Sequence, residues 1–106
     1  MKTLDRSVVD EIVRRLVAEF QPEQIILFGS RAWGNAEDDS DVDLLVIVSK
    51  SNERPTQRAS RAYHCLGGMG VPTDILVKTR AEADRFRHVP ASLEHKIFHQ
   101  GKVLYE

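Results

Sequence analysis

The segments FGSRAWG (residues 28–34) and SDVDLLV (residues 40–46) decide the fold of this chain. The first ends a short apolar run in a Gly-Ser turn, and the second places Asp41 and Asp43 at the start of another apolar run. A glycine lets the backbone approach a phosphate closely, and carboxylate oxygens are ligands that Mg²⁺ prefers. Together the two segments predict metal-dependent chemistry on a nucleotide.

The composition is that of a small globular protein. A chain of 106 residues predicts one domain, spanning residues 1–106, and its 42% hydrophobic and 29% charged residues are ordinary values. The net charge of −1 argues against general binding to DNA or RNA. The single cysteine, Cys65, excludes an internal disulfide. Since no signal-peptide pattern and no membrane-spanning apolar run occurs, we expect a cytoplasmic protein without membrane contact.

The charged residues are unevenly distributed along the chain. Five acids lie within residues 37–43. Residues 50–61 contain a single acid and four basic residues, Lys50, Arg54, Arg58 and Arg61. This arrangement suits a metal-bound polyphosphate, and it equally suits two solvated surfaces. For Arg58 and Arg61, three positions apart on a predicted helix, we favour a solvated face over contacts with a triphosphate or a partner.

The periodicity of apolar residues predicts alternating helices and strands. Strands are expected over residues 24–28, 42–48 and 72–79, with a short edge strand over 102–106. Helices are expected over residues 4–20, 30–33, 55–66, 80–86 and 92–99, with Ser30, Thr79 and Ser92 as N-terminal caps. The order predicts a single small α/β domain with a mixed β-sheet and helices packed mainly on one face.

Strand geometry predicts how the polar residues meet. Asp41 and Asp43 point to one face, because side chains two residues apart in a strand do so. An antiparallel strand 24–28 would place the Gly29-Ser30 turn beside them, and a parallel strand 72–79 would bring Asp74 alongside. The alternative is that the first two are solvated loop acids and that Asp74, after Pro-Thr, is only a turn residue.

These residues carry a resemblance to a known family. Gly29-Ser30, ten intervening residues and then Asp41-Val42-Asp43 resemble the signature of the DNA polymerase beta-like nucleotidyltransferase superfamily. The two longer segments and the closing residues 101–105 are similar to its minimal nucleotidyltransferase branch, whose members are short single-domain proteins. The resemblance covers nearly the whole chain, although Thr73 precedes Asp74 where the family usually has an apolar residue.

The resemblance implies a function for each motif. It implies a nucleotidyltransferase domain that uses ATP as substrate with Mg²⁺, two ions of which are expected. Asp41, Asp43 and Asp74 would be the catalytic and metal-binding carboxylates, and Gly29 and Ser30 would form the phosphate-binding turn. Arg31 is a further candidate for phosphate contact, or else a surface arginine.

The resemblance also implies a partner. Minimal members are often encoded with a helical HEPN-family toxin, and the nucleotidyltransferase acts as antitoxin by transferring AMP to a tyrosine of the toxin. We expect a protein acceptor here, because the core fold takes up the whole chain; a homo-oligomer is possible. The alternatives are an antitoxin that neutralises its partner by binding alone, and a nucleotidyltransferase acting on a small molecule.

The remaining aromatic and polar residues are interpreted structurally. Trp33, Tyr63 and Tyr105 are expected to pack, and Cys65 to be a buried small apolar residue. His95 and His99 lie four positions apart but lack a third ligand for zinc.

Overall fold

The computed structural model describes residues 5–34 and 41–106. These residues form elements in the predicted order: α1 (Arg6–Phe20), β1 (Gln24–Phe28), α2 (Ser30–Trp33), β2 (Val42–Val48), α3 (Pro55–Cys65), β3 (Thr73–Thr79), α4 (Arg80–Phe86), α5 (Leu93–Gln100) and β4 (Lys102–Tyr105). Three residues of the acidic cluster, Glu37, Asp38 and Asp39, lie outside the described residues.

The strands form one mixed sheet in the order β3-β2-β1-β4. Strand β1 pairs antiparallel with β2 and with β4, and β2 pairs parallel with β3 across the α3 crossover. The two predicted pairings, β1 with β2 and β2 with β3, are thereby confirmed. The predicted edge strand is β4.

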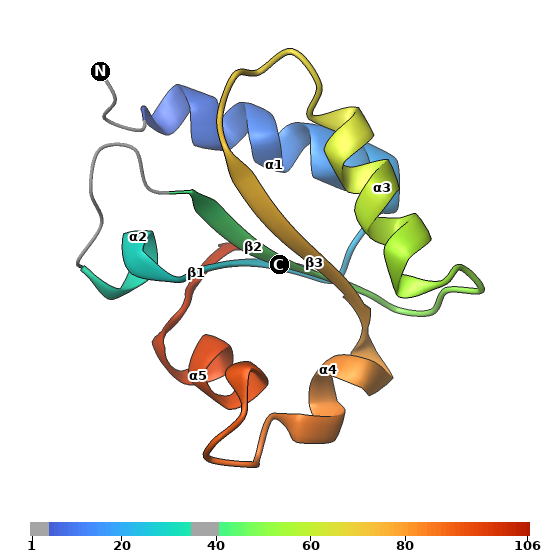
Figure 1. The fold of residues 1–106 in the computed structure, drawn as a ribbon, viewed down its shortest axis with the longest axis vertical. Coiled ribbons are helices and arrows are strands. Elements are labelled where there is room, and N and C mark those ends of the chain that lie inside the picture. The colour runs from blue at the N-terminus through green and yellow to red at the C-terminus, as the bar shows by residue number, and fades with distance from the viewer. Residues whose placement is uncertain (1–4, 35–40) are drawn as a thin grey trace.

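Helices cover each face of this sheet (Figure 1). Leu44 and Val46 of β2 belong to a buried cluster with residues of α1 and α3. Leu45 and Ile47, which point to the opposite face, belong to a second cluster with Ala83 of α4 and residues of α5. The mixed α/β fold is as predicted, with one correction: α1 and α3 dominate one face, but the other face is covered as well. The reason is that β2 is apolar on both faces from Leu44 to Val48 and therefore needs cover on two sides.

Two of the predicted helix caps are present. Thr79 accepts a hydrogen bond from the Glu82 amide and Glu82 accepts one from the Thr79 amide, so α4 begins with a capping box. Ser92 accepts from the His95 amide at the start of α5. The prediction of Ser30 as a cap was wrong, because Gly29 is the N-cap of α2 and Ser30 is its first helical residue. Among the residues that the structure describes, no helix is long and apolar enough to cross a membrane.

Side chains from α3 and α4 cap the outer edge of β3. The Ile75 N–H donates to Tyr63 Oη at 3.2 Å, Arg58 Nη1 donates to the Val77 carbonyl at 2.8 Å, and the Thr79 N–H donates to Glu82 Oε1 at 2.9 Å. These backbone groups alternate along the strand, as outward-facing groups of an edge strand do. Three outward-facing backbone groups of this edge are therefore satisfied from within the chain.

Arg58 is consequently not a solvated residue, and that prediction was wrong. Its side chain is buried and its guanidinium meets the Glu82 carboxylate at 2.8 and 3.1 Å. On a helical wheel of α3, Arg58 falls between Cys65 and Ala62, and β3 and α4 close over it. Arg61, the other half of the prediction, is partly covered and forms ion pairs with Glu19 and Glu53.

This ion pair predicts an acid-dependent stability. The hydrogen bonds from Arg58 lower the pKa of Glu82 to about 2, so its stabilising contribution is present above its usual value near 4.5 and is lost as the pH falls towards 2. We expect Glu82→Gln to lower the free energy of unfolding by about 1 kcal/mol at pH 7, since the side chain is partly screened by solvent. The difference from wild type should shrink between pH 5 and 2, measured by urea unfolding.

A surface ion pair offers the matched control. Glu23 pairs with Arg80 at 2.8 Å, and neither side chain is buried. Glu23→Gln should change the free energy of unfolding much less than Glu82→Gln. Equal losses in the two variants would show that burial of Arg58 does not matter.

Candidate active site

Three aspartates from two neighbouring strands lie at one end of the sheet. Asp43 pairs with Asp74 across the parallel β2–β3 ladder, and Asp41 directly precedes β2. The Val42 N–H donates to the Pro72 carbonyl at 2.9 Å, so the register continues to the start of the strands. Asp41 and Asp74 are exposed and Asp43 is half-buried. The predicted juxtaposition is thus present in the backbone.

The electrostatics show that these carboxylates interact. Partial burial raises the pKa of the Asp43 carboxyl above its usual value, and the negative charges of Asp74 and then Asp41 raise it further. Like charges disfavour one another's ionised forms when they are close and poorly hydrated. The cluster is therefore a region of accumulated negative charge, which favours binding of a cation.

Gly29 lies against Asp43, as the predicted antiparallel pairing implied, and the approach is closer than any side chain would allow. Phe28 pairs with Asp43 in the β1–β2 ladder, so Gly29 follows directly beside the carboxylate. A Cβ at Gly29 would lie 1.9 Å from Asp43 Oδ2, and the residue has φ +76° and ψ −161°. Such angles are accessible essentially to glycine alone. Glycine is required here by its neighbour and by its conformation, besides any approach of phosphate.

The turn after Gly29 presents the start of α2. The Gly29 carbonyl accepts hydrogen bonds from the Ala32 and Trp33 amides at 3.0 Å each. The amides of Ser30 and Arg31 are the first two of this helix. Ser30 and Arg31 are each half-buried. The structure therefore places the predicted phosphate-binding residues next to the aspartates.

The donor set suits a divalent metal ion. Carboxylate oxygens are hard ligands of the kind that Mg²⁺ takes, usually one or two carboxylates together with water and substrate phosphates. Within residues 5–34 and 41–106, no three Asp, Glu, His or Cys side chains already stand as a metal-ligand set. The mutual repulsion recorded in the raised pKa of Asp43 is the interaction that a bound cation would relieve.

Tyr63 contacts the candidate site, and no sequence pattern predicts this contact. Its hydroxyl lies 3.4 Å from Asp74 Oδ1 and accepts the Ile75 N–H. The prediction that Tyr63 packs in the core was wrong, since 45% of the residue is exposed. The contact depends on how α3 crosses β3, which spacing alone does not give.

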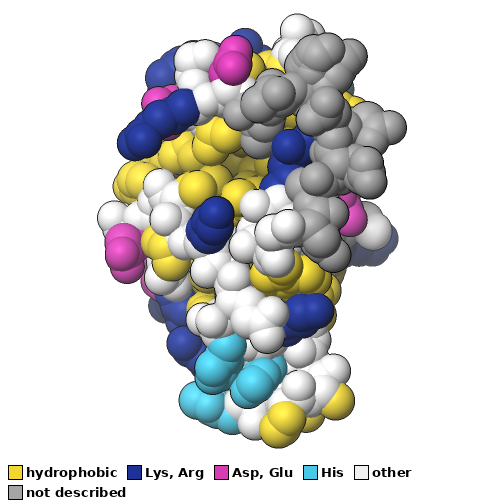
Figure 2. Space-filling view, turned by 90° about the vertical axis from the view of Figure 1, so that its left-hand side faces the viewer, with side chains coloured by type: hydrophobic (Ala, Val, Ile, Leu, Met, Phe, Trp, Pro, Cys, Tyr) yellow, Lys and Arg dark blue, Asp and Glu magenta, His cyan; other side chains and the backbone are white. Residues whose placement is uncertain are grey.

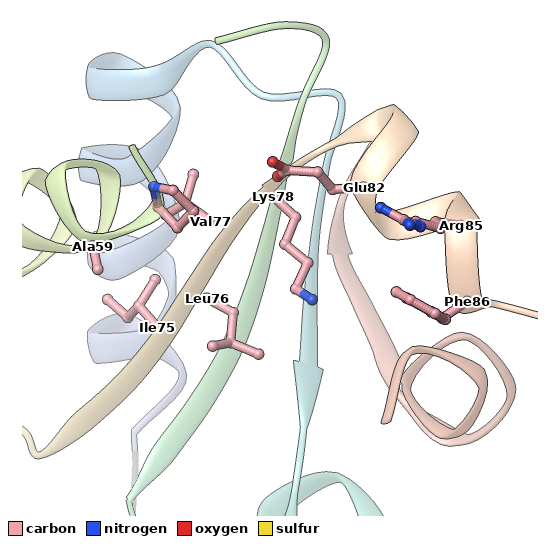
Figure 3. Close-up of a pocket in the computed structure, with 9 residues that line it drawn as sticks. Ala59, Ile75, Leu76, Val77, Lys78, Glu82, Arg85 and Phe86 are labelled. Atoms are coloured by element: carbon pink, nitrogen blue, oxygen red, sulfur yellow. The ribbon is translucent and has the colours of Figure 1, made fainter. Parts of the chain in front are cut away.

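An apolar cavity of about 290 Å³ runs along β3, beginning one residue beyond Asp74. Figure 3 shows its wall of β3 residues, with Ala59 of α3 on one side and Phe86 of α4 on the other. Leu76 and Lys78 point to the same face of β3 as Asp74, because they alternate with Ile75 and Val77. The cavity is therefore a hollow next to the third carboxylate.

The histidines lie apart from the aspartates. Figure 2 shows histidine side chains gathered at one end of a face, and the rings of His95 and His99 stack at 4.0 Å. Trp33 packs as predicted, with Lys96 Nζ 3.8 Å from the centre of its ring. Cys65 is half-buried, and burial raises the pKa of its thiol. None of these groups adds to the site.

Comparisons of sequence and structure with known proteins both point to nucleotidyltransferases. Residues 10–106 match the family described as polymerase beta, nucleotidyltransferase. A crystal structure of a candidate nucleotidyltransferase from Sulfolobus solfataricus is similar with a TM-score of 0.61 and 28% sequence identity, over 74% of this chain and 70% of that one. No curated protein sequence matches the chain.

Gly29→Ala tests the contact with Asp43. We expect it to lower the free energy of unfolding by about 2 kcal/mol or more, because the new Cβ displaces the carboxylate and strains the backbone. Gly68→Ala is the control: Gly68 has φ +84°, but no described atom lies within 4 Å of its Cβ position. It should lose about 1 kcal/mol from backbone strain alone. Equal losses in thermal or urea unfolding would contradict the account.

Asp43→Asn tests the charge cluster. Since the pKa of Asp43 is raised in the folded state, ionised Asp43 costs stability at pH values above that pKa. The variant should therefore unfold at a higher temperature than wild type at pH 7, in metal-free buffer, and the gain should disappear as the pH falls to about 3. Asp10→Asn, on an exposed position of α1, should show no such pH-dependent gain. A less stable Asp43→Asn protein at pH 7 would mean that the carboxylate is structural.

Proposed function

Because the chain belongs to the polymerase beta nucleotidyltransferase family, we propose that it transfers AMP from ATP to a hydroxyl group on a partner protein. The observation that carries the proposal is the pairing of Asp43 with Asp74, directly beside the Gly29 turn. It brings acidic side chains from two strands and the Gly29 turn to one end of the sheet.

Each residue has a role in this proposal. Asp41 and Asp43 would hold Mg²⁺ together with the triphosphate, and the amides after Gly29 would bind phosphate oxygens. Mg²⁺, when bound, neutralises the charge that develops on the phosphates. Asp74, the outermost of the three carboxylates, would help to hold the metal and would accept the proton of the acceptor hydroxyl. Ser30 and Arg31 are candidates for further phosphate contacts.

The reaction is an in-line displacement at the α-phosphorus. The acceptor oxygen forms a bond to this phosphorus while the bond to the β-phosphate oxygen breaks, so that pyrophosphate leaves. The acceptor proton passes to a carboxylate at the site. Such a transfer needs mainly positioning and charge stabilisation from the protein, and the described site supplies groups for each.

The cavity along β3 supports a protein acceptor. Its lining is mostly apolar, with Leu76 and Phe86 next to the charged ends of Lys78 and Arg85. An apolar or aromatic side chain lying there would carry a hydroxyl towards Asp74, two residues before Leu76. The tyrosine of a HEPN-family toxin, with this chain as its antitoxin, is the acceptor that we propose.

The test is a transfer assay with ATP labelled at the α-phosphate, Mg²⁺ and the helical protein encoded beside this chain. Wild type should label the partner, and Asp41→Asn or Asp43→Asn should reduce the rate at least about a hundredfold while staying folded. Removing Mg²⁺ with a chelator should have the same effect. Asp10→Asn serves as the control for a lost surface carboxylate.

Two other outcomes would each contradict the proposal. An unlabelled partner that binds tightly and is silenced by the protein would show an antitoxin that acts by binding alone. Label on a small molecule, with none on the protein, would show a different acceptor class.

A further inference from the structure

The hydroxyl of Tyr63 contacts the third carboxylate from the edge of the sheet. Tyr63 belongs to α3, which packs on the face of the sheet opposite to the aspartates. Its Oη nevertheless lies 3.4 Å from Asp74 Oδ1 and 3.2 Å from the Ile75 nitrogen. The side chain thus reaches around β3 and ends beside Asp74.

The direction of the hydrogen bonds follows from the chemistry of the groups. The Ile75 N–H can only donate, so it occupies an acceptor position on Tyr63 Oη. The phenol has one proton of its own, and an ionised carboxylate can only accept. Tyr63 therefore donates to Asp74 Oδ1, while Oδ2 stays available to another group.

We infer that Tyr63 is a positioning residue that holds the Asp74 carboxylate in its working orientation. The inference rests on the proposed function, in which Asp74 completes the site. Asp74 is exposed and lies opposite Asp43, whose negative charge repels it. The hydrogen bond to Oδ1 opposes rotation of the Asp74 carboxylate away from Asp43.

The other two caps of β3 provide a comparison within the same strand. Arg58 and Glu82 satisfy the Val77 carbonyl and the Thr79 amide, and they bind each other. In the part of the chain that the structure describes, neither forms a hydrogen bond or an ion pair with Asp41, Asp43 or Asp74. If Tyr63 served only to satisfy the Ile75 N–H, its hydroxyl would not need to lie within reach of Asp74.

Tyr63→Phe removes this hydroxyl and keeps the ring. In the transfer assay we expect kcat to fall by about tenfold to a hundredfold, the range for groups that orient a metal or catalytic ligand. The KM for ATP should stay within about twofold, because Tyr63 does not touch the proposed phosphate-binding turn. Tyr105→Phe, on β4 at the opposite edge of the sheet, should leave both constants unchanged.

A double-mutant cycle shows whether the hydroxyl acts through Asp74. In the Asp74→Asn background, Tyr63→Phe should cause little further loss of rate, because the positioned carboxylate is already absent. Losses that multiply in the double variant would mean that Tyr63 acts independently of Asp74, and would overturn the inference.

Metal binding separates this inference from the proposed function. Mn²⁺ affinity is measured by electron paramagnetic resonance with a non-hydrolysable ATP analogue, so that no acceptor is needed. Wild type and Tyr105→Phe should bind equally, and Tyr63→Phe about tenfold more weakly. If the three proteins show these Mn²⁺ affinities but wild type transfers no AMP, the proposed function fails and the role of Tyr63 stands.

Two results would overturn the role of Tyr63. One is an equal Mn²⁺ affinity in wild type and Tyr63→Phe. The other is AMP found on Tyr63 itself by mass spectrometry after turnover, which would make the residue an acceptor.

Discussion

Asp43 is fixed by two strand pairings at once, and the candidate site depends on this constraint. It lies opposite Phe28 in β1 and opposite Asp74 in β3. The glycine turn and the third carboxylate are therefore placed by backbone hydrogen bonds. The neighbouring Leu44 and Leu45 are fully buried on opposite faces, so the register cannot slip without exposing them. The core of the sheet thus holds repelling carboxylates together, and the raised pKa of Asp43 records the cost.

The outer edge of β3 contributes both to the stability of the fold and to the candidate site. Tyr63, Arg58 and Glu82 satisfy three of its outward backbone groups, and these side chains interrupt the edge where another strand could pair. The cap nearest the site also touches Asp74, and the cap farthest from it begins α4. The cavity lies between these helices, so an acceptor placed there would contact side chains rather than extend the sheet.

Local sequence signals predicted the elements of this fold, and tertiary contacts decided what they missed. The apolar run of β2, the Thr79 capping box and the long α3 crossover each have a pattern, and the position of Asp74 beside Asp43 follows from them. The burial of Arg58 was not predicted, because its charge is satisfied by Glu82, 24 positions along the chain. The contact of Tyr63 with Asp74 likewise needs the packing angle of α3. The position of Gly29 beside the aspartates was predicted, but the lack of space there for a Cβ was not.

The central claim is that the three aspartates and the Gly29 turn form one site for a metal-bound nucleotide. The most direct measurement is a crystal structure with Mn²⁺ and a non-hydrolysable ATP analogue, in which anomalous scattering locates the metal. The account predicts a metal about 2.1 Å from carboxylate oxygens of Asp41 and Asp43, with the phosphates at the turn after Gly29. A nucleotide bound elsewhere, with the metal away from these aspartates, would contradict it.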